Sequence, residues 1–381
     1  DWFHYGAFRQ INLDYFAGQT SKRGEGDAIV VGEYDEYEAY RRAGSAGDFA
    51  RAHGLDQLPW DQKVMEHPSY DEFWQGQALD KLVAQRPSSI PTIWLQGLWD
   101  QEDMWGAIHC YLALKKAGQA DHNYLVMGPW QHSQVNREGY SLGPLRWDGD
   151  TTAQFRRDVL RPFFDQYLKN GAPKADPPNV LIYNTGENHW DRFRDWPLAC
   201  ENGCASPMKP LYLEAGFSLG FDKPSASGAA DSYVSDPAKP VPYIPRPVNF
   251  SDSSRWGPWL VTDQRAVEDR TDVLVYATDV LTKPVRISGE PIADLYAATT
   301  GTDADWVVKL IDVYPDEVPS QPEMGGYELA LSMDIFRGRY RESFERPSAI
   351  PAGKPQRYRF VLPAANHVFL PGHRIMVQIQ S

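Results

Sequence analysis

The sequence predicts an α/β sheet fragment, preceded by a helical segment and followed by an all-β domain of the sandwich or jelly-roll type. Three observations support this. Residues 1–88 carry charged, helix-like patches between Gly- and Pro-containing joints. Apolar runs alternate with helical patterns up to about residue 170, and short β-like runs between Gly, Pro, Asp and Ser clusters follow residue 178. We set the domains at residues 1–88, 89–204 and 205–381.

The first segment is interpreted as a helical insertion that covers another part of the molecule and has little core of its own. The elements expected next are a strand at residues 91–95, a helix at 104–116 ending at Gly118, a strand at 123–127 and an amphipathic helix at 152–169. The apolar run at 180–183 opens the β-rich part, and the Pro-, Ser- and Asp-rich stretch at 222–258 is expected to be a long loop.

Composition restricts the partners. The chain has 38 Lys and Arg against 51 Asp and Glu, and the net charge of -13 argues against nucleic acid or an anionic membrane as partner. No apolar run of about 18 residues is present, so no membrane span is predicted. The nine His show no zinc spacing and no phosphate-binding loop follows a strand, so neither a metal nor another cofactor is predicted.

The three cysteines give limited information. Cys110 lies inside a helical pattern, as expected for a small buried hydrophobic residue. Cys200 and Cys204 are close enough for a local disulfide in an oxidising compartment, and an unpaired surface loop is the alternative. The sequence leaves both possibilities open.

Acidic side chains follow the first predicted strand, and a histidine follows the second. Asp100, Glu102 and Asp103 come after the apolar run at 93–98, and His132 comes after the strand at 123–127. An acid and then a histidine after consecutive strands is the chain order of the last two triad members in an α/β-hydrolase sheet. The two residues are therefore candidates for a catalytic acid and base, and the alternative for His132 is a surface or hydrogen-bonded structural histidine. The alternative for the carboxylates is a solvated turn that caps the next helix. Their mutual repulsion calls for a nearby cation.

The nucleophile is not evident. Two Gly-x-Ser-x-Gly strings, at 139–143 and 216–220, lie outside any strand–turn–helix context and follow His132, which is the wrong order for this fold. We interpret both as turns. The chain opens at Asp1 rather than Met and ends in an apolar alternation, so we expect both ends to be cut from a longer sequence. The β domain would then be incomplete at its C-terminus.

Several longer motifs surround these residues. They are Gly97-Leu98-Trp99-Asp100-Gln101-Glu102-Asp103, Gly128-Pro129-Trp130-Gln131-His132, the cap-like strings at 1–9 and 67–74, and the jelly-roll-like strings at 306–315 and 372–375. Together they resemble the α-amino acid ester hydrolases. That family belongs to the α/β-hydrolase group that also contains the X-prolyl dipeptidyl peptidases, cocaine esterase and glutaryl acylases.

The resemblance implies an α/β-hydrolase sheet fragment with a helical cap, followed by a jelly roll. It implies a serine hydrolase or acyltransferase that acts through an acyl-enzyme on α-amino acid esters and amides, including α-amino β-lactam antibiotics. Asp100 and His132 would be the triad acid and base, while the serine elbow and the oxyanion-hole donors would precede Asp1. The substrate's α-ammonium would bind Asp1, Glu102 and Asp103, since a primary ammonium offers one donor to each carboxylate.

The resemblance further implies small-molecule partners, namely α-amino esters and amides and β-lactam nuclei, together with a homo-oligomer and a periplasmic or secreted location. Two alternatives remain. Another esterase, acylase or dipeptidyl peptidase of the same group would keep Asp100 and His132 without needing Glu102 and Asp103. A non-catalytic carbohydrate-binding β-sandwich protein would use its aromatic side chains as stacking platforms.

Overall fold

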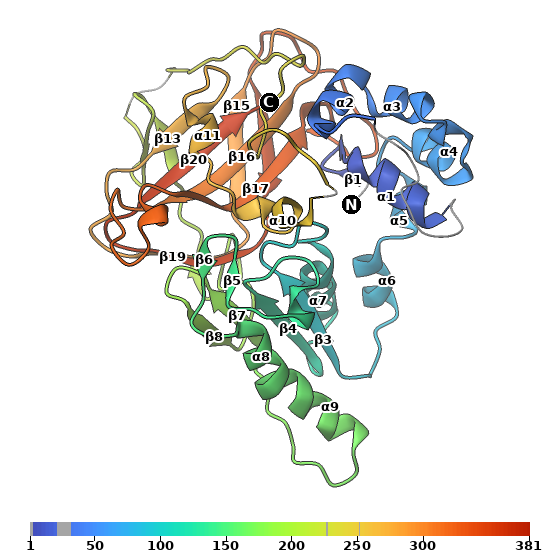
Figure 1. The fold of residues 1–381 in the computed structure, drawn as a ribbon, viewed down its shortest axis with the longest axis vertical. Helices are drawn as coiled ribbons and strands as arrows, with labels where there is room; N and C mark the ends of the chain where they lie inside the picture. The colour runs from blue at the N-terminus through green and yellow to red at the C-terminus, as the bar shows by residue number, and fades with distance from the viewer. Residues whose placement is uncertain (1–2, 21–31, 226–227, 251) are drawn as a thin grey trace.

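A computed structural model describes residues 3–20, 32–225, 228–250 and 252–381. Figure 1 shows three parts: the helical cap in blue, a sheet flanked by helices in teal and green below it, and a β domain in orange and red beside both. Asp1, expected at the substrate, lies outside the described residues. Within those residues, no helix has the length and apolar character needed to cross a membrane.

The cap consists of a hairpin followed by short helices. Its elements are β1 (Phe3–His4), β2 (Ala7–Phe8), α1 (Ile11–Thr20), α2 (Glu36–Ala43), α3 (Ala46–Ala52), η1 (Leu55–Gln57), α4 (Pro59–Glu66), α5 (Glu72–Gln75) and α6 (Leu79–Gln85). The helices agree with prediction. The expectation of little core is wrong, because α1, α3 and α4 bury a shared apolar cluster that includes Leu13, Phe49 and Val64. The hairpin was not predicted, since two-residue strands carry no periodic signal.

The hydrolase sheet has the strand order β3-β4-β7-β8. Its strands are β3 (Thr92–Gly97), β4 (Asn123–Gly128), β7 (Val180–Asn184) and β8 (His189–Phe193). The first three run parallel and β8 runs antiparallel at one edge. Among the described strands, β3 pairs only with β4. The run at 180–183, which we read as the start of the β-rich part, therefore belongs to this sheet.

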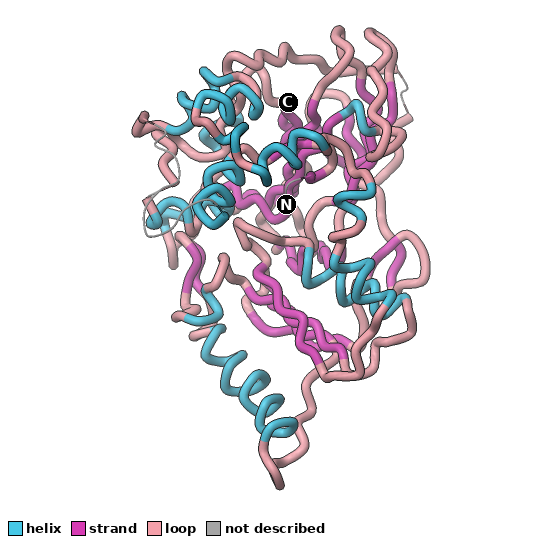
Figure 2. The backbone as a smooth tube through the Cα atoms, turned by 90° about the vertical axis from the view of Figure 1, so that its right-hand side faces the viewer, coloured by secondary structure: helices cyan, strands magenta, loops and turns pink. Residues whose placement is uncertain are grey.

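Helices cover both faces of this sheet, as Figure 2 shows. Helix α7 (Gly106–Lys116) joins β3 to β4, and a helical run made of α8 (Thr151–Phe155), the π-helical turn η3 (Arg156–Leu160) and α9 (Arg161–Leu168) follows β4. Alternate residues of β4 face opposite sides: Leu125 packs in the core that contains α7, whereas Val126 packs with Phe155 of α8. The strand–helix–strand–helix prediction is confirmed.

The β domain is a jelly roll. Its largest sheet contains β11 (Tyr212–Glu214), β12 (Ser218–Gly220), β13 (Leu274–Ala277), β20 (Arg374–Gln380), β16 (Asp305–Val313) and β17 (Glu328–Arg337), in that spatial order. Two further pairs are β14 (Val285–Gly289) with β19 (Ala365–Phe369), and β15 (Ile292–Ala297) with β18 (Gln356–Val361). The core of the hydrolase sheet continues into this domain, because Leu329 and Phe369 belong to the same buried cluster as Leu125.

The remaining elements are short. They are η2 (Gln134–Asn136), β5 (Ser141–Leu142), β6 (Leu145–Arg146), β9 (Ala199–Cys200), β10 (Ser206–Pro207), α10 (Ser253–Trp256), η4 (Trp259–Val261), α11 (Arg265–Glu268), η5 (Pro322–Met324) and η6 (Gly338–Tyr340). Of the described residues at 222–258, only α10 is helical and none is in a strand, as expected of a long loop. Cys200 and Cys204 form a disulfide, and Cys110 is buried with a free thiol.

Candidate active site

The turns after β3 and β4 are held against each other by backbone hydrogen bonds. The Leu98 N–H donates to the Gly128 carbonyl at 2.8 Å, and the Trp99 N–H donates to the Trp130 carbonyl at 3.2 Å. A side chain at Gly97 would bring its Cβ to 2.5 Å from the Trp130 carbonyl oxygen. Glycine is therefore required at this position by the close approach of the two turns, which carry Asp100 and His132.

Asp100 and His132 lie side by side. His132 Nδ1 is 3.2 Å from each carboxylate oxygen of Asp100, whose side chain is 13% exposed against 42% for His132. Asp100 Oδ1 also accepts the N–H groups of Glu102 at 2.9 Å and Asp103 at 3.2 Å. A carboxylate facing Nδ1 assigns the proton to that nitrogen and leaves Nε2 free to accept one. The pair can therefore act as an oriented general base.

Glu102 and Asp103 lie in different environments. Asp103 Oδ1 accepts the N–H groups of Trp105 at 2.7 Å and Gly106 at 2.9 Å, so this carboxylate caps the start of α7. Glu102 Oε2 lies 3.6 Å from His132 Nε2, and its side chain is 34% exposed. Asp103 thus caps the next helix, as the alternative interpretation of the carboxylates predicts. Glu102 instead points toward His132 Nε2, the nitrogen that would accept a proton from a nucleophile. No group of three or more His, Cys, Asp or Glu in the described ranges is arranged to hold a metal ion.

Sequence reasoning missed two residues that organise this turn. Arg9 donates from its two terminal nitrogens to the carbonyls of Gln101 at 2.8 Å and Glu102 at 2.9 Å. The Gln101 side chain is buried and its Oε1 accepts the His132 backbone N–H at 3.0 Å. Burial lowers the pKa of Arg9, an effect opposed by the carboxylates of Glu102, Asp103 and Asp100. Arg9 therefore brings a positive charge near the clustered carboxylates, while its hydrogen bonds go to the backbone carbonyls of the turn.

Neither Gly-x-Ser-x-Gly string is a nucleophile elbow. Ser141 lies in β5 and Ser218 in β12, each next to a turn, so the strings border turns rather than being turns throughout. Among the described residues, the hydrogen bonds of the His132 ring go to Asp100 and none goes to a serine hydroxyl.

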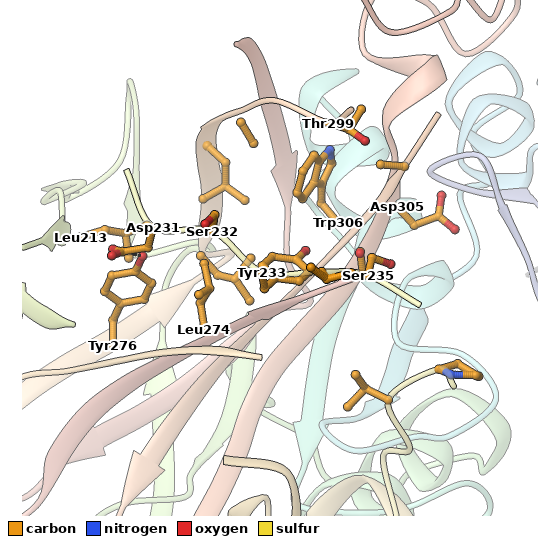
Figure 3. A pocket seen from close by; sticks show the side chains of 18 of the residues that line it. Leu213, Asp231, Ser232, Tyr233, Ser235, Leu274, Tyr276, Thr299, Asp305 and Trp306 are labelled. Atoms are coloured by element: carbon orange, nitrogen blue, oxygen red, sulfur yellow. Dashed lines mark hydrogen bonds between the residues drawn. The ribbon is translucent and has the colours of Figure 1, made fainter. Parts of the chain in front are cut away.

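A cavity of about 2080 Å³ lies elsewhere, between the cap, the long loop and the β domain (Figure 3). Its wall contains Tyr233, Tyr276 and Trp306, and the Tyr276 hydroxyl donates to Asp231 Oδ2 at 2.8 Å. Arg9 reaches this wall, but Asp100, Glu102, Asp103 and His132 do not line it. The Asp100–His132 pair is therefore separate from this cavity.

Two family models cover most of the chain. Residues 1–134 match the X-Pro dipeptidyl-peptidase (S15 family) model, and residues 170–381 match the X-Pro dipeptidyl-peptidase C-terminal non-catalytic domain. Cocaine esterase of Rhodococcus sp. (strain MB1 Bresler) is 34% identical over 337 residues, which are 85% of this chain and 54% of the esterase.

Two solved structures are closer in sequence. An α-amino acid ester hydrolase superposes with a TM-score of 0.97 at 61% identity, and an aminopeptidase from a marine sediment archaeon (Thaumarchaeota archaeon) with a TM-score of 0.92 at 49% identity. Each match covers 100% of this chain and 62% of the other. The chain thus spans a little over half the length of the relatives it matches. It belongs to the X-Pro dipeptidyl-peptidase (S15) family of α/β-hydrolases, a group of serine hydrolases that includes cocaine esterase and the α-amino acid ester hydrolases.

Proposed function

We propose that this chain supplies the acid, the base and the amine-binding turn of a serine hydrolase that acts on α-amino acid esters and amides, including α-amino β-lactam antibiotics. One observation carries the proposal. In the turn after β3, the Asp100 carboxylate faces Nδ1 of His132 while the Glu102 carboxylate lies 3.6 Å from Nε2. The general base His132 and the negative charge of Glu102 are therefore adjacent. A substrate with an ammonium next to its reacting carbonyl needs both groups at this spacing.

In the proposed reaction, a serine outside these 381 residues gives its proton to His132 Nε2 and attacks the substrate carbonyl. Asp100 stabilises the imidazolium that forms, and the leaving alcohol or amine takes the proton. Water or a β-lactam amine then attacks the acyl-enzyme with His132 again as base. Glu102 accepts a hydrogen bond from the substrate ammonium. We keep Asp1 and Asp103 as its further partners, because a capping carboxylate still has lone pairs to offer.

The aminopeptidase match favours a second candidate activity at the same site. An aminopeptidase acts at a free amino terminus, so its substrate also places an α-ammonium beside the reacting carbonyl. We propose release of an amino-terminal residue from short peptides as the alternative. The Cys200–Cys204 disulfide supports a periplasmic or secreted location. A homo-oligomer is proposed from the family resemblance.

The experiment compares Glu102→Gln with the wild type in the enzyme that contains the serine. Substrates are phenylglycine methyl ester, its N-acetylated form and a phenylglycine dipeptide. Loss of one charge-assisted hydrogen bond, about 1.5–3 kcal/mol, should raise KM for the free-amine ester roughly ten- to a hundredfold and leave the N-acetylated ester unchanged.

Glu138→Gln is the matched control, because Glu138 follows His132 in an exposed loop and only its backbone carbonyl accepts a hydrogen bond, from the Gln134 side chain. This variant should behave as the wild type. An equal loss on the free-amine and N-acetylated esters would refute amine recognition by Glu102. Turnover of the dipeptide but not of the ester would favour the aminopeptidase activity.

A further inference from the structure

The hairpin β1–β2 is attached to strand β17 of the jelly roll. His4 Nε2 lies 2.6 Å from both carboxylate oxygens of Asp334, whose side chain is 6% exposed. The Arg337 N–H donates to the Tyr5 carbonyl at 3.0 Å. The His4–Asp334 pair, in which the Asp334 side chain is nearly buried, and the backbone hydrogen bond between Arg337 and Tyr5 together fix the hairpin on this strand.

The tip of the hairpin packs into the same surface. The Tyr5 ring lies 5.9–6.0 Å from the rings of Phe336, Phe344 and Phe360, all of the jelly roll. Gly6 has φ +83°, and a Cβ there would overlap the Tyr340 ring. The hairpin therefore has little freedom to move independently of the β domain, and Figure 1 shows β1 between the cap helices and this domain.

The other end of the hairpin reaches the acidic turn. Arg9 follows β2 (Ala7–Phe8) directly, and its guanidinium spans the successive carbonyls of Gln101 and Glu102. This forked geometry is one that a lysine cannot reproduce. Gln101 in turn holds the backbone N–H of His132.

A second contact from the same strand supports the turn. Trp99 Nε1 donates to the carbonyl of Ala330 in β17 at 3.0 Å. Strand β17 therefore contacts the turn directly through Trp99 and indirectly through His4, the hairpin and Arg9. The two contacts flank Asp100, with Trp99 on one side and Gln101 and Glu102 on the other.

We infer that the jelly roll determines amine recognition, with Asp334, His4 and Arg9 acting as positioning residues for the Glu102 carboxylate. The inference rests on the proposed function, because it assigns a cause to the placement of the proposed ammonium acceptor. None of these three side chains needs to touch the substrate. Their effect passes through the backbone of the turn at Gln101 and Glu102.

The test uses the serine-containing enzyme and measures one ratio: kcat/KM for phenylglycine methyl ester divided by kcat/KM for phenylacetic acid methyl ester, which lacks the amine. Loss of folded protein lowers both values equally and leaves the ratio unchanged. Asp334→Asn keeps the side-chain shape and removes the charge paired with His4. Arg9→Lys keeps the positive charge and removes the two-pronged donation to the carbonyls of Gln101 and Glu102. Each should lower the ratio roughly tenfold.

Asp294→Asn is the control, because Asp294 pairs with Arg357 on the neighbouring strands β15 and β18 of the same domain. Its ratio should stay at the wild-type value. If Asp334→Asn does not fold, Arg9→Lys decides the question. A high wild-type ratio that both variants retain would overturn the inference alone. A wild-type ratio near one would overturn the proposed function, and the inference with it.

Discussion

In the serine-containing enzyme, replacing Asp100 by Asn should sharply reduce turnover and leave the turn intact, because the carboxylate makes two separable sets of contacts. Its Oδ1 accepts the N–H groups of Glu102 at 2.9 Å and Asp103 at 3.2 Å, and an Asn carbonyl can keep both. The new amide N–H₂ would face His132 Nδ1, which must then accept a hydrogen bond. The ring proton moves to Nε2, which can no longer take the serine proton. The expected loss in kcat is about 10⁴-fold, or about 5 kcal/mol of transition-state stabilisation.

Asp100→Ala supplies the comparison. It removes the same charge and also leaves the two turn N–H groups without their acceptor, at about 1–3 kcal/mol for each group that stays buried. Steady-state kinetics on an α-amino ester and thermal unfolding of both variants separate the effects. We expect a similar loss of kcat in both, with a lowered unfolding temperature only for Ala. An Asn variant that keeps a tenth or more of wild-type kcat would refute the triad assignment.

Three further predictions concern stability. Asp103→Ala should lower the free energy of unfolding by about 1 kcal/mol through loss of the α7 cap, and an unchanged urea midpoint would contradict this. Gly97→Ala should cost about 1–3 kcal/mol because its Cβ would meet a carbonyl of the adjoining turn. By the same urea titration, Gly47→Ala in helix α3, where the added Cβ would meet only the Arg51 side chain at 3.5 Å, should stabilise by up to about 1 kcal/mol. Burial raises the pKa of Glu328 to about 9, so the folded state holds a proton that the unfolded chain releases above about pH 4.5. Stability should therefore fall as pH rises from 5 to 8, and Glu328→Gln should reduce that slope; equal slopes in the two proteins would contradict the assignment.

The contact between Asp100 and His132 was predictable because the placement of the two residues follows from general rules. Strands β3 and β4 are apolar runs separated by an amphipathic helix, so they had to pair in parallel, and the side chains at their carboxyl ends had to meet. Asp100 and His132 do lie together for this reason. The fold class could also be predicted, because the apolar residues of each long helix or strand recur at the spacing typical of that element.

Other features depend on contacts that no local pattern records. Arg9 reaches the carbonyls of Gln101 and Glu102 from about a quarter of the chain away, and its own neighbours resemble any surface turn. The run that forms β7 is apolar throughout, a pattern shared by buried strands of parallel sheets and of sandwiches. Asp103 could cap a helix or bind an ammonium by sequence alone, and only the position of α7 shows the capping bond.

The decisive experiment on the proposed mechanism is a burst measurement with a p-nitrophenyl ester of an α-amino acid. If Asp100 and His132 serve a serine outside these 381 residues, the folded chain alone should release no burst of p-nitrophenol. The enzyme that includes the serine should release a stoichiometric burst, and His132→Ala should remove it. A stoichiometric burst from the 381-residue chain by itself would contradict the proposed division of the triad.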